Sequence, residues 1–458
     1  MKRVFGAVCL LCLLALQTKA QTNKSNNTSL PIGVFDSGTG GLTVLEAMLS
    51  LDAFNNVTGK AGADGKPDFN KEYFQYLADQ ANMPYGNYAA ENKTDLLKEH
   101  ILKNMQFLLQ PNFIKNNGSV AKPNVKMIVL ACNTATAYAL TDIKTKFSQE
   151  HINVPVIGVI EAGAKAALAY QKAHGTGTIG VFATAGTVAS EGYPKTLQNM
   201  AKEKGLPALS VISQGGAGLA ESIDRDWSYF VDTLTKARNE YKGPSLKNQK
   251  YTIDTSLLLA YKFDKSKNKL LCEYDDKGSC LDMQLNDPSN YVRYHLVSLL
   301  EKMLQQKTVV PMNTLILGCT HYPYLRDTIA KVLTELYNYK NNNQYRYRNC
   351  ITAHVELIDP SVETAKEAYL ALRAKELTNK QAVQQNLFFI TIPNKNLAEV
   401  KLQPDGWFTY DYKYGRVAGA KKEYVQYAPF DKENISKASY ERFSLVLPHA
   451  YKQIAKTL

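Results

Sequence analysis

Short apolar runs recur along the chain, and each is followed by a turn and a longer segment with helical spacing. Short runs indicate buried strands, and the longer periodic segments indicate helices. Repeated strand-then-helix units are typical of α/β domains with a largely parallel sheet. We therefore predict an α/β fold with helices at 42–51 and 361–377 and strands at 32–35, 73–77, 125–130, 154–159, 179–182, 209–212, 314–317 and 355–358.

Three stretches depart from this rhythm. Residues 55–69 form a polar, glycine-rich insertion. Residues 224–312 are rich in Tyr, Lys and Asp and show helical patterning only near 291–306. The tail from 404 to 458 is rich in Tyr and Lys, and no clear structure can be predicted for it. We expect the last two stretches to be additions to the α/β core.

The N-terminus has the pattern of a targeting segment. Lys2 and Arg3 precede a 13-residue apolar run, and Thr18-Lys19-Ala20 follows it. That order is typical of a secretory signal peptide, and the run is shorter than the roughly 20 residues a spanning helix needs. We predict a signal peptide at 1–20, a polar leader at 21–30, export to the periplasm and no stable membrane insertion. An uncut anchor is the alternative, and the protein is cytoplasmic if the signal is not used.

Composition and charge give no sign of a nucleic-acid-binding protein. Of the 458 residues, 45% are hydrophobic and 21% charged, as in an ordinary folded protein. The formal net charge is +12, of which the predicted signal contributes three, leaving +9. This charge is spread along the chain without a dense basic run or a recognisable binding module, so we expect no nucleic-acid partner.

The cysteines fall into two kinds of surroundings. Two of the seven lie in the predicted signal, and the remaining odd number implies at least one free thiol after export. Cys272 and Cys280 lie eight apart in a polar stretch and could form a disulfide. None of the five cysteines outside the predicted signal forms a CxxC pair as in a zinc site, so we expect no metal.

Two segments echo each other around Cys132 and Cys319. Each has an apolar strand, a small residue and the cysteine, followed by polar residues that can cap a helix: VLACNTAT at 129–136 and ILGCTHYP at 316–323. Ligands of open α/β sheets bind beyond the carboxyl ends of the strands, where both cysteines fall. A helix N-terminus next to them would favour the thiolate. A lone buried cysteine is usually a small apolar residue, but two matching motifs favour function.

Two thiols at one site suit the inversion of a stereocentre without a cofactor. A thiolate on one face of Cα removes the proton, and a thiol on the other face delivers one. A gap on the order of ten units between the acidity of Cα–H and of a thiol corresponds to roughly 14 kcal/mol that the site must offset. Backbone N–H groups and helix N-termini facing the substrate carboxylate could supply part of this stabilisation.

Three further segments hold polar residues at predicted strand ends or turns. In IGVFDSGTGGL (32–42), Asp36 and Ser37 follow a strand, and Asp36 could orient an ammonium group, tune a cysteine or simply cap a turn. The glycines do not have phosphate-loop spacing. Met83-Pro84-Tyr85-Gly86 alone predicts a turn, and Thr184 and Thr187 could be helix caps or ligand donors.

Taken together, these segments resemble the glutamate racemases of the aspartate/glutamate racemase superfamily. The matching pieces occur in the family's order and are IGVFDSGTGGLTVL (32–45), MPYG (83–86), ACNTATA (131–137), VPVIGVIEAG (154–163), IGVFATAGT (179–187), GCTHYPYL (318–325) and LIDPSVETA (357–365). The resemblance implies two similar three-layer α/β domains with mainly parallel sheets and an active site in the cleft between them. It implies a first domain at 30–153 plus 348–403, a second at 154–347 with an insertion at 224–312, and a C-terminal extension at 404–458.

The resemblance also implies roles for individual residues. Cys132 and Cys319 would be the acid/base pair, assisted by Asp36 and His321 respectively. The substrate-binding positions would be Asp36, Ser37, Tyr85, Gly86, Asn133, Thr134, Thr184, Thr187, Thr320 and His321. The family needs neither a metal nor pyridoxal phosphate, its substrate is a small amino acid, and a homodimer is one possible assembly.

Three features depart from the family pattern. Gln214 stands where the family carries a glutamate, residues 224–312 lengthen the second domain, and a signal peptide is unexpected because D-glutamate for peptidoglycan is needed in the cytoplasm. The leading hypothesis is interconversion of L- and D-glutamate for cell-wall synthesis. The alternatives are racemisation of aspartate or another amino acid, an exported amino-acid-binding protein that has lost catalysis, and a Cys/His thiol hydrolase.

Overall fold

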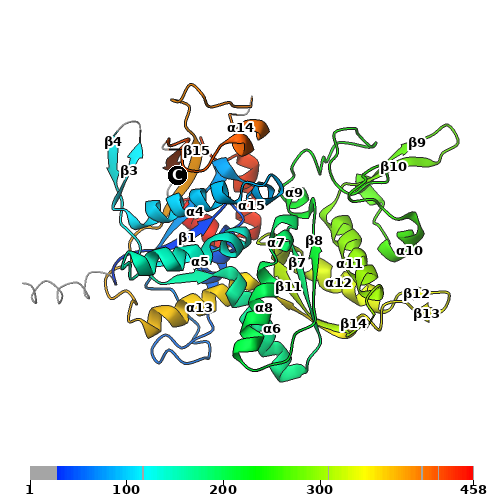
Figure 1. Cartoon of the computed structure of the whole chain (residues 1–458), viewed down its shortest axis with the longest axis horizontal. Coiled ribbons are helices and arrows are strands. Elements are labelled where there is room, and N and C mark those ends of the chain that lie inside the picture. Colours follow the sequence, from blue (N-terminus) through cyan, green and yellow to red (C-terminus); the bar gives the residue numbers. More distant parts are fainter. Residues whose placement is uncertain (1–27, 116–117, 308, 404–405, 421, 457–458) are drawn as a thin grey trace, which may run out of the picture.

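The computed structural model describes residues 28–115, 118–307, 309–403, 406–420 and 422–456 (Figure 1). The predicted signal peptide and most of the leader lie outside these residues. Within them, no helix is both long and apolar enough to cross a membrane.

Two separate sheets organise the chain, and both are mainly parallel. The first has six strands in the order β16-β15-β2-β1-β5-β6, and only the β15–β16 pair is antiparallel. The second has four parallel strands in the order β14-β11-β7-β8. The strands of the first sheet are β1 (Ile32–Asp36), β2 (Phe74–Ala78), β5 (Met127–Leu130), β6 (Val156–Gly158), β15 (Leu387–Pro393) and β16 (Val425–Pro429). Those of the second are β7 (Thr178–Ala183), β8 (Val211–Gly215), β11 (Met312–Gly318) and β14 (Ile351–Ile358). The α/β class and all eight predicted strands are confirmed.

Helices cover both faces of each sheet and give three layers. Buried apolar side chains form one core on each side of the first sheet and one on each side of the second. The helices on the first sheet include α2 (Leu42–Ser50), α4 (Thr94–Leu109), α5 (Asn133–Gln149) and α13 (Pro360–Ala374). Those on the second include α6 (Val159–His174), α8 (Gly192–Glu203), α11 (Pro288–Leu304) and α12 (Arg326–Tyr337).

Two strands belong to a different sheet from the one that the predicted domain boundaries imply. Strand β6, expected in the second domain, pairs with β5 in the first sheet, whereas β14, expected in the first domain, pairs with β11 in the second. The chain changes sheets within α6 and returns within α13, and these two helices pack against each other. A crossover helix returns the chain beside the strand it left, so α5 places β6 next to β5. The domain limits themselves remain an expectation.

The segment at 224–312 is more than an addition. Its helix α11, predicted near 291–306, packs on β8 and α12 and supplies much of the buried core of the second half. Strands β9 (Leu270–Tyr274) and β10 (Cys280–Leu285) form a hairpin that a disulfide between Cys272 and Cys280 links, the pair that the sequence offered as a possibility. Figure 1 shows this hairpin projecting from the edge of the second half.

The C-terminal tail folds onto the first half. Strand β16 adds an antiparallel edge to the sheet, and α15 (Lys437–Val446) and α16 (Pro448–Ile454) pack near α2. Phe443, Leu447 and Ile454 are buried in the same core as β1 and β2. The short helix α14 (Tyr410–Gly415) lies on the opposite side of the sheet, where Tyr414 is buried.

Candidate active site

The loop after β1 wraps around the carboxylate of Asp36. This buried side chain accepts hydrogen bonds from the backbone N–H groups of Gly38 at 3.1 Å and Gly41 at 3.0 Å. A Cβ at Gly41 would lie 2.4 Å from Cβ of Asp36, so this approach needs glycine. Burial raises the pKa of Asp36, although the two backbone donors and the nearby His321 oppose the shift. The carboxylate is therefore held in place and desolvated at the carboxyl end of β1.

Cys132 begins α5 directly after strand β5. Its sulfur accepts a hydrogen bond from the backbone N–H of Ala135 at 3.4 Å, so the thiol itself is the helix cap. The sulfur also lies 3.5 Å from the hydroxyl oxygen of Ser37. Burial, reinforced by the negative charge of Asp36, raises the pKa of Cys132 to about 12, although its hydrogen bonds with Ser37 and Ala135 oppose the shift. In this environment the Cys132 thiol is protonated at neutral pH.

Cys319 follows β11 at the equivalent strand end of the second sheet. Its sulfur lies 3.7 Å from Nδ1 of His321, and Nε2 of His321 lies 3.1 Å from Oδ2 of Asp224. Burial disfavours the charged imidazole, but Asp224 and the hydrogen bond to Cys319 together raise the pKa of His321 well above its ordinary value. The predicted cap by the polar residue after each cysteine is wrong in both segments. Cys132, not Asn133, caps α5, and a 3-10 turn without a side-chain cap, η4 (Tyr322–Leu325), follows Thr320 and precedes α12.

The two strand ends meet where the halves contact each other. A Cβ at Gly40 would lie 2.4 Å from Oγ1 of Thr320 and 2.8 Å from Cε1 of His321, so the loop after β1 touches the segment after β11. The hydroxyl of Tyr193 on α8 donates to Oδ1 of Asn133 at 2.8 Å. Asp36, Cys132 and Asn133 thus face the segment of Cys319, Thr320 and His321.

Thr134 and Thr187 add a second contact between the halves. Their hydroxyl oxygens lie 3.4 Å apart. Thr184 caps α7 (Ala185–Ala189) by accepting from the backbone N–H of Thr187 at 3.2 Å, as one of the two sequence interpretations expected. The backbone of Gly86 packs directly on Gly186, where a Cβ would lie 2.4 Å from Cα of Gly86.

Tyr85 is placed differently from the other predicted binding residues. Its buried hydroxyl donates to Oδ2 of Asp79 at 2.5 Å. Asp79 also accepts from Thr391 at 2.6 Å, so the hydroxyl of Tyr85 is part of a closed buried network. The backbone next to it, Met83 and Pro84, is held by the tail through Lys413 Nζ and the Tyr414 hydroxyl.

The sequence did not single out Asp224 or Arg442. Asp224 lies just beyond α9 (Leu219–Ile223), at the start of the irregular segment, and Arg442 lies on α15 of the tail. Arg442 pairs with Oδ1 of Asp224. Gln214 donates to the carbonyl of Gly215 and lies 3.4 Å from His295. Neither local pattern nor motif marks Asp224 or Arg442, since only the fold brings them to His321.

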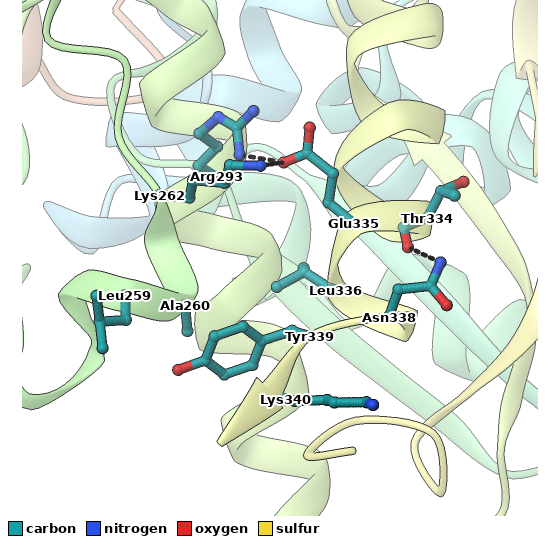
Figure 2. A pocket seen from close by; sticks show the side chains of 10 residues that line it. All are labelled: Leu259, Ala260, Lys262, Arg293, Thr334, Glu335, Leu336, Asn338, Tyr339 and Lys340. Atoms are coloured by element: carbon teal, nitrogen blue, oxygen red, sulfur yellow. Dashed lines mark hydrogen bonds and ion pairs between the residues drawn. The ribbon is translucent and has the colours of Figure 1, made fainter. Parts of the chain in front are cut away.

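A cavity of about 430 Å³ lies away from these residues, against α10 (Leu258–Tyr261), α11 and α12. Figure 2 shows Arg293 pointing to Glu335 across it, with an Nη1–Oε2 distance of 2.8 Å. Its cationic groups are thereby partly neutralised, and none of the predicted site residues lines it. Over the described ranges, no cluster of three or more His, Cys, Asp or Glu side chains has the arrangement to hold a metal ion.

Comparisons with known proteins agree with the motifs. Residues 111–240 match the family model described as Asp/Glu/Hydantoin racemase. A glutamate racemase of Levilactobacillus brevis is 27% identical over 361 residues, which span 79% of this chain and 85% of that protein. One from Enterococcus faecalis is 28% identical over 371 residues, spanning 81% and 89%. The crystal structure of glutamate racemase isoform RacE1 from Bacillus anthracis aligns with a TM-score of 0.47 at 24% identity, covering 79% of this chain and 89% of that one. Together with the motifs, the sequence matches indicate an amino-acid racemase, an isomerase, that is similar to the glutamate racemases over most of its length and to the Asp/Glu/Hydantoin racemase model over residues 111–240.

Proposed function

We propose that this protein interconverts L- and D-glutamate, with Cys132 and Cys319 exchanging protons at Cα from opposite faces. The observation that carries the proposal is the pair of buried free thiols at the carboxyl ends of β5 and β11, each with an ionisable partner. The glutamate racemases among the relatives favour glutamate over other amino acids.

The chemistry balances without any group from outside the site. A thiolate takes the Cα proton and leaves a carbanion whose charge spreads into the substrate carboxylate. The opposite thiol gives its proton to the other face of Cα and becomes the thiolate. One turnover therefore inverts the stereocentre and exchanges the protonation states of the two cysteines.

The two thiols differ in a way that suits this exchange. The pKa of Cys132, raised to about 12 by burial and by Asp36, keeps that thiol ready to donate a proton. The imidazole of His321 lies 3.7 Å from the sulfur of Cys319. We assign the removal of the first proton to Cys319 and the delivery of a proton to Cys132, and after one turnover the roles are reversed.

The remaining predicted residues suit substrate binding. Hydroxyl and amide groups lie beside the thiols on Ser37, Asn133, Thr134, Thr187 and Thr320. We assign to them, with Thr184 and the backbone of Gly86, the orientation of the substrate's ammonium and carboxylate groups. Tyr85, whose hydroxyl donates to Asp79, would hold the backbone of Gly86 in place. We further propose that the product D-glutamate serves peptidoglycan synthesis. The predicted signal peptide favours export, whereas peptidoglycan synthesis needs D-glutamate in the cytoplasm. Fractionation of cells expressing the full chain tests this role: protein in the cytoplasm supports it, and protein found only outside the cytoplasm contradicts it.

Racemisation of L-glutamate, followed by circular dichroism, tests the proposal. The wild type and Cys350→Ala, which removes a buried cysteine away from the site, should both lose the optical signal at equal rates. Cys132→Ala and Cys319→Ala should each lower kcat by at least about a thousandfold, because either change removes one of two required proton carriers. Full activity of either variant contradicts the two-thiol mechanism. Faster turnover of aspartate than of glutamate contradicts the substrate, and no turnover of any amino acid contradicts catalysis.

A further inference from the structure

The C-terminal tail carries one side chain across to the other half of the molecule. Helix α15 is anchored in the first half, since Phe443 and Leu447 are buried in the core below β1 and β2. From the same helix, Arg442 pairs with Oδ1 of Asp224 and donates to Oγ1 of Thr39 at 3.4 Å. Thr39 lies in the loop that wraps around Asp36, and Figure 1 shows α15 reaching the second half near α9.

Asp224 belongs to the second half. Its backbone N–H closes the last turn of α9 by donating to the carbonyl of Ala220 at 3.0 Å, and Leu219 at the start of that helix is fully buried. The two carboxylate oxygens of Asp224 serve different partners, because Oδ1 faces Arg442 and Oδ2 faces Nε2 of His321 at 3.1 Å. Arg442, Asp224, His321 and Cys319 thus form a continuous chain of polar contacts.

Each step of this chain restricts the next. A carboxylate on one imidazole nitrogen fixes the ring's orientation and keeps the other nitrogen aimed at its reaction partner. A guanidinium holds a carboxylate through directed hydrogen bonds. The side chains of Arg442, Asp224 and His321 are only 23%, 28% and 14% exposed, so solvent screens these contacts less than it screens an open surface pair.

The carboxylate that contacts His321 comes from a position that the sequence comparison with the family did not indicate. Gln214 occupies the position where the resemblance leads us to expect a glutamate, and its amide contacts Gly215 and His295 instead of His321. The carboxylate that reaches His321 comes from Asp224, at the end of a five-residue helix on the rim of the long insertion. Arg442 pairs with Oδ1 of this carboxylate, the oxygen that does not face His321.

We propose that Arg442 is a positioning residue, through which the C-terminal tail holds Asp224 in the orientation that His321 needs to serve Cys319. This inference rests on the proposed function. The other ionisable groups around the chain are Asp36 on β1, Glu46 on α2, Glu221 on α9, Asp226 beyond it and Tyr324 on η4. They are the same in every variant described below, so they do not account for a difference between variants.

The experiment follows the titration of His321 by NMR in full-length protein with labelled histidine, with its signal assigned by His321→Gln. Without Arg442, Asp224 is free to turn toward solvent and the imidazole loses its fixed carboxylate. Arg442→Gln should therefore lower the pH of half-titration of His321 by about one unit, a tenfold change in proton affinity. Arg442→Lys should restore part of the shift. Lys437→Gln, which removes an exposed cation from the same helix, should match the wild type.

The sign of the shift separates the possible outcomes. If Arg442 acted only as a nearby positive charge, its removal would raise the pH of half-titration, and that result overturns the proposal. An unchanged titration overturns it as well, even if the variant is less stable to heat. Racemisation by the same proteins tests the proposed function separately: an inactive wild type refutes that function, whereas the His321 titration still decides the role of Arg442.

Discussion

His295 makes the stability of the second half depend on pH. It lies on α11, is fully buried, and places Nε2 3.0 Å from the carbonyl oxygen of Ala217. Its Nδ1 lies 3.4 Å from Nε2 of Gln214, so the neutral imidazole can donate through Nε2 and accept through Nδ1. Burial lowers the pKa of His295 from 6.5 to about 4, although the hydrogen bond to Ala217 opposes the shift.

The sign and size of the effect follow from this shift. Between pH 6.5 and about 4, the unfolded chain binds a proton at His295 that the folded protein does not accept. Stability is therefore fully present above pH 6.5 and falls as the pH falls toward 4. A gap of about 2.5 units at about 1.36 kcal/mol per unit gives a loss of about 3 kcal/mol.

Urea denaturation at several pH values between 7 and 4.5 measures this loss. The difference in unfolding free energy between wild type and His295→Asn should shrink by about 2 kcal/mol over that range, since only the wild type has this histidine to protonate. His174→Asn removes an exposed histidine on α6 and should leave the slope of the wild type unchanged. A His295→Asn protein whose stability falls with pH as steeply as that of the wild type would refute the reasoning.

Three further predictions concern other contacts. Tyr193→Phe removes the hydrogen bond to Asn133 and leaves a buried carbonyl without its donor, so unfolding in urea should show a loss of about 1–3 kcal/mol, and the same stability as the wild type would contradict it. Asp36→Asn removes a negative charge beside Cys132, so the pH midpoint for alkylation of Cys132, read by peptide mass spectrometry, should fall. A midpoint that stays or rises would show that Asp36 does not raise the pKa of this thiol. The double change Cys272→Ser and Cys280→Ser removes the disulfide of the β9–β10 hairpin and should lower the unfolding free energy by about 2–3 kcal/mol relative to the oxidised wild type, as estimated from loop entropy. Thermal unfolding measures this loss, and the reduced wild type should show the same loss. Equal stability of the variant and the oxidised wild type would contradict it.

The sequence predicted the parts of the site that local patterns determine. The apolar runs before Asp36, Cys132 and Cys319 located the ends of three strands. Because ligands bind at the carboxyl ends of parallel strands, the sequence predicted that these three residues belong to one site. Spacing and polarity also identified the Cys272–Cys280 pair. These features depend on residues close to one another in the chain, so periodicity and motif spacing are sufficient to find them.

Contacts between distant segments could not be predicted in this way. Arg442 reaches Asp224 across 218 positions, and neither residue lies in a periodic strand or a recognisable motif. The pairing of β6 with β5 and of β14 with β11 depends on which helix crosses between the sheets, a choice that apolar runs do not encode. The tail's Tyr- and Lys-rich composition likewise gave no sign that α15 would pack beneath β1 and β2.

Deuterium incorporation at Cα early in the reaction tests the two-thiol account most directly. L-Glutamate is incubated with the wild-type protein in deuterated water. At low conversion the two enantiomers are separated, and mass spectrometry measures the deuterium content of each. The account predicts D-glutamate carrying one deuterium at Cα and remaining L-glutamate that is still protiated, because the proton is delivered by the second thiol from the opposite face. Deuterium in the remaining L-glutamate at the same rate, or its absence from the D-glutamate product, would show that one group handles both faces and would contradict the account.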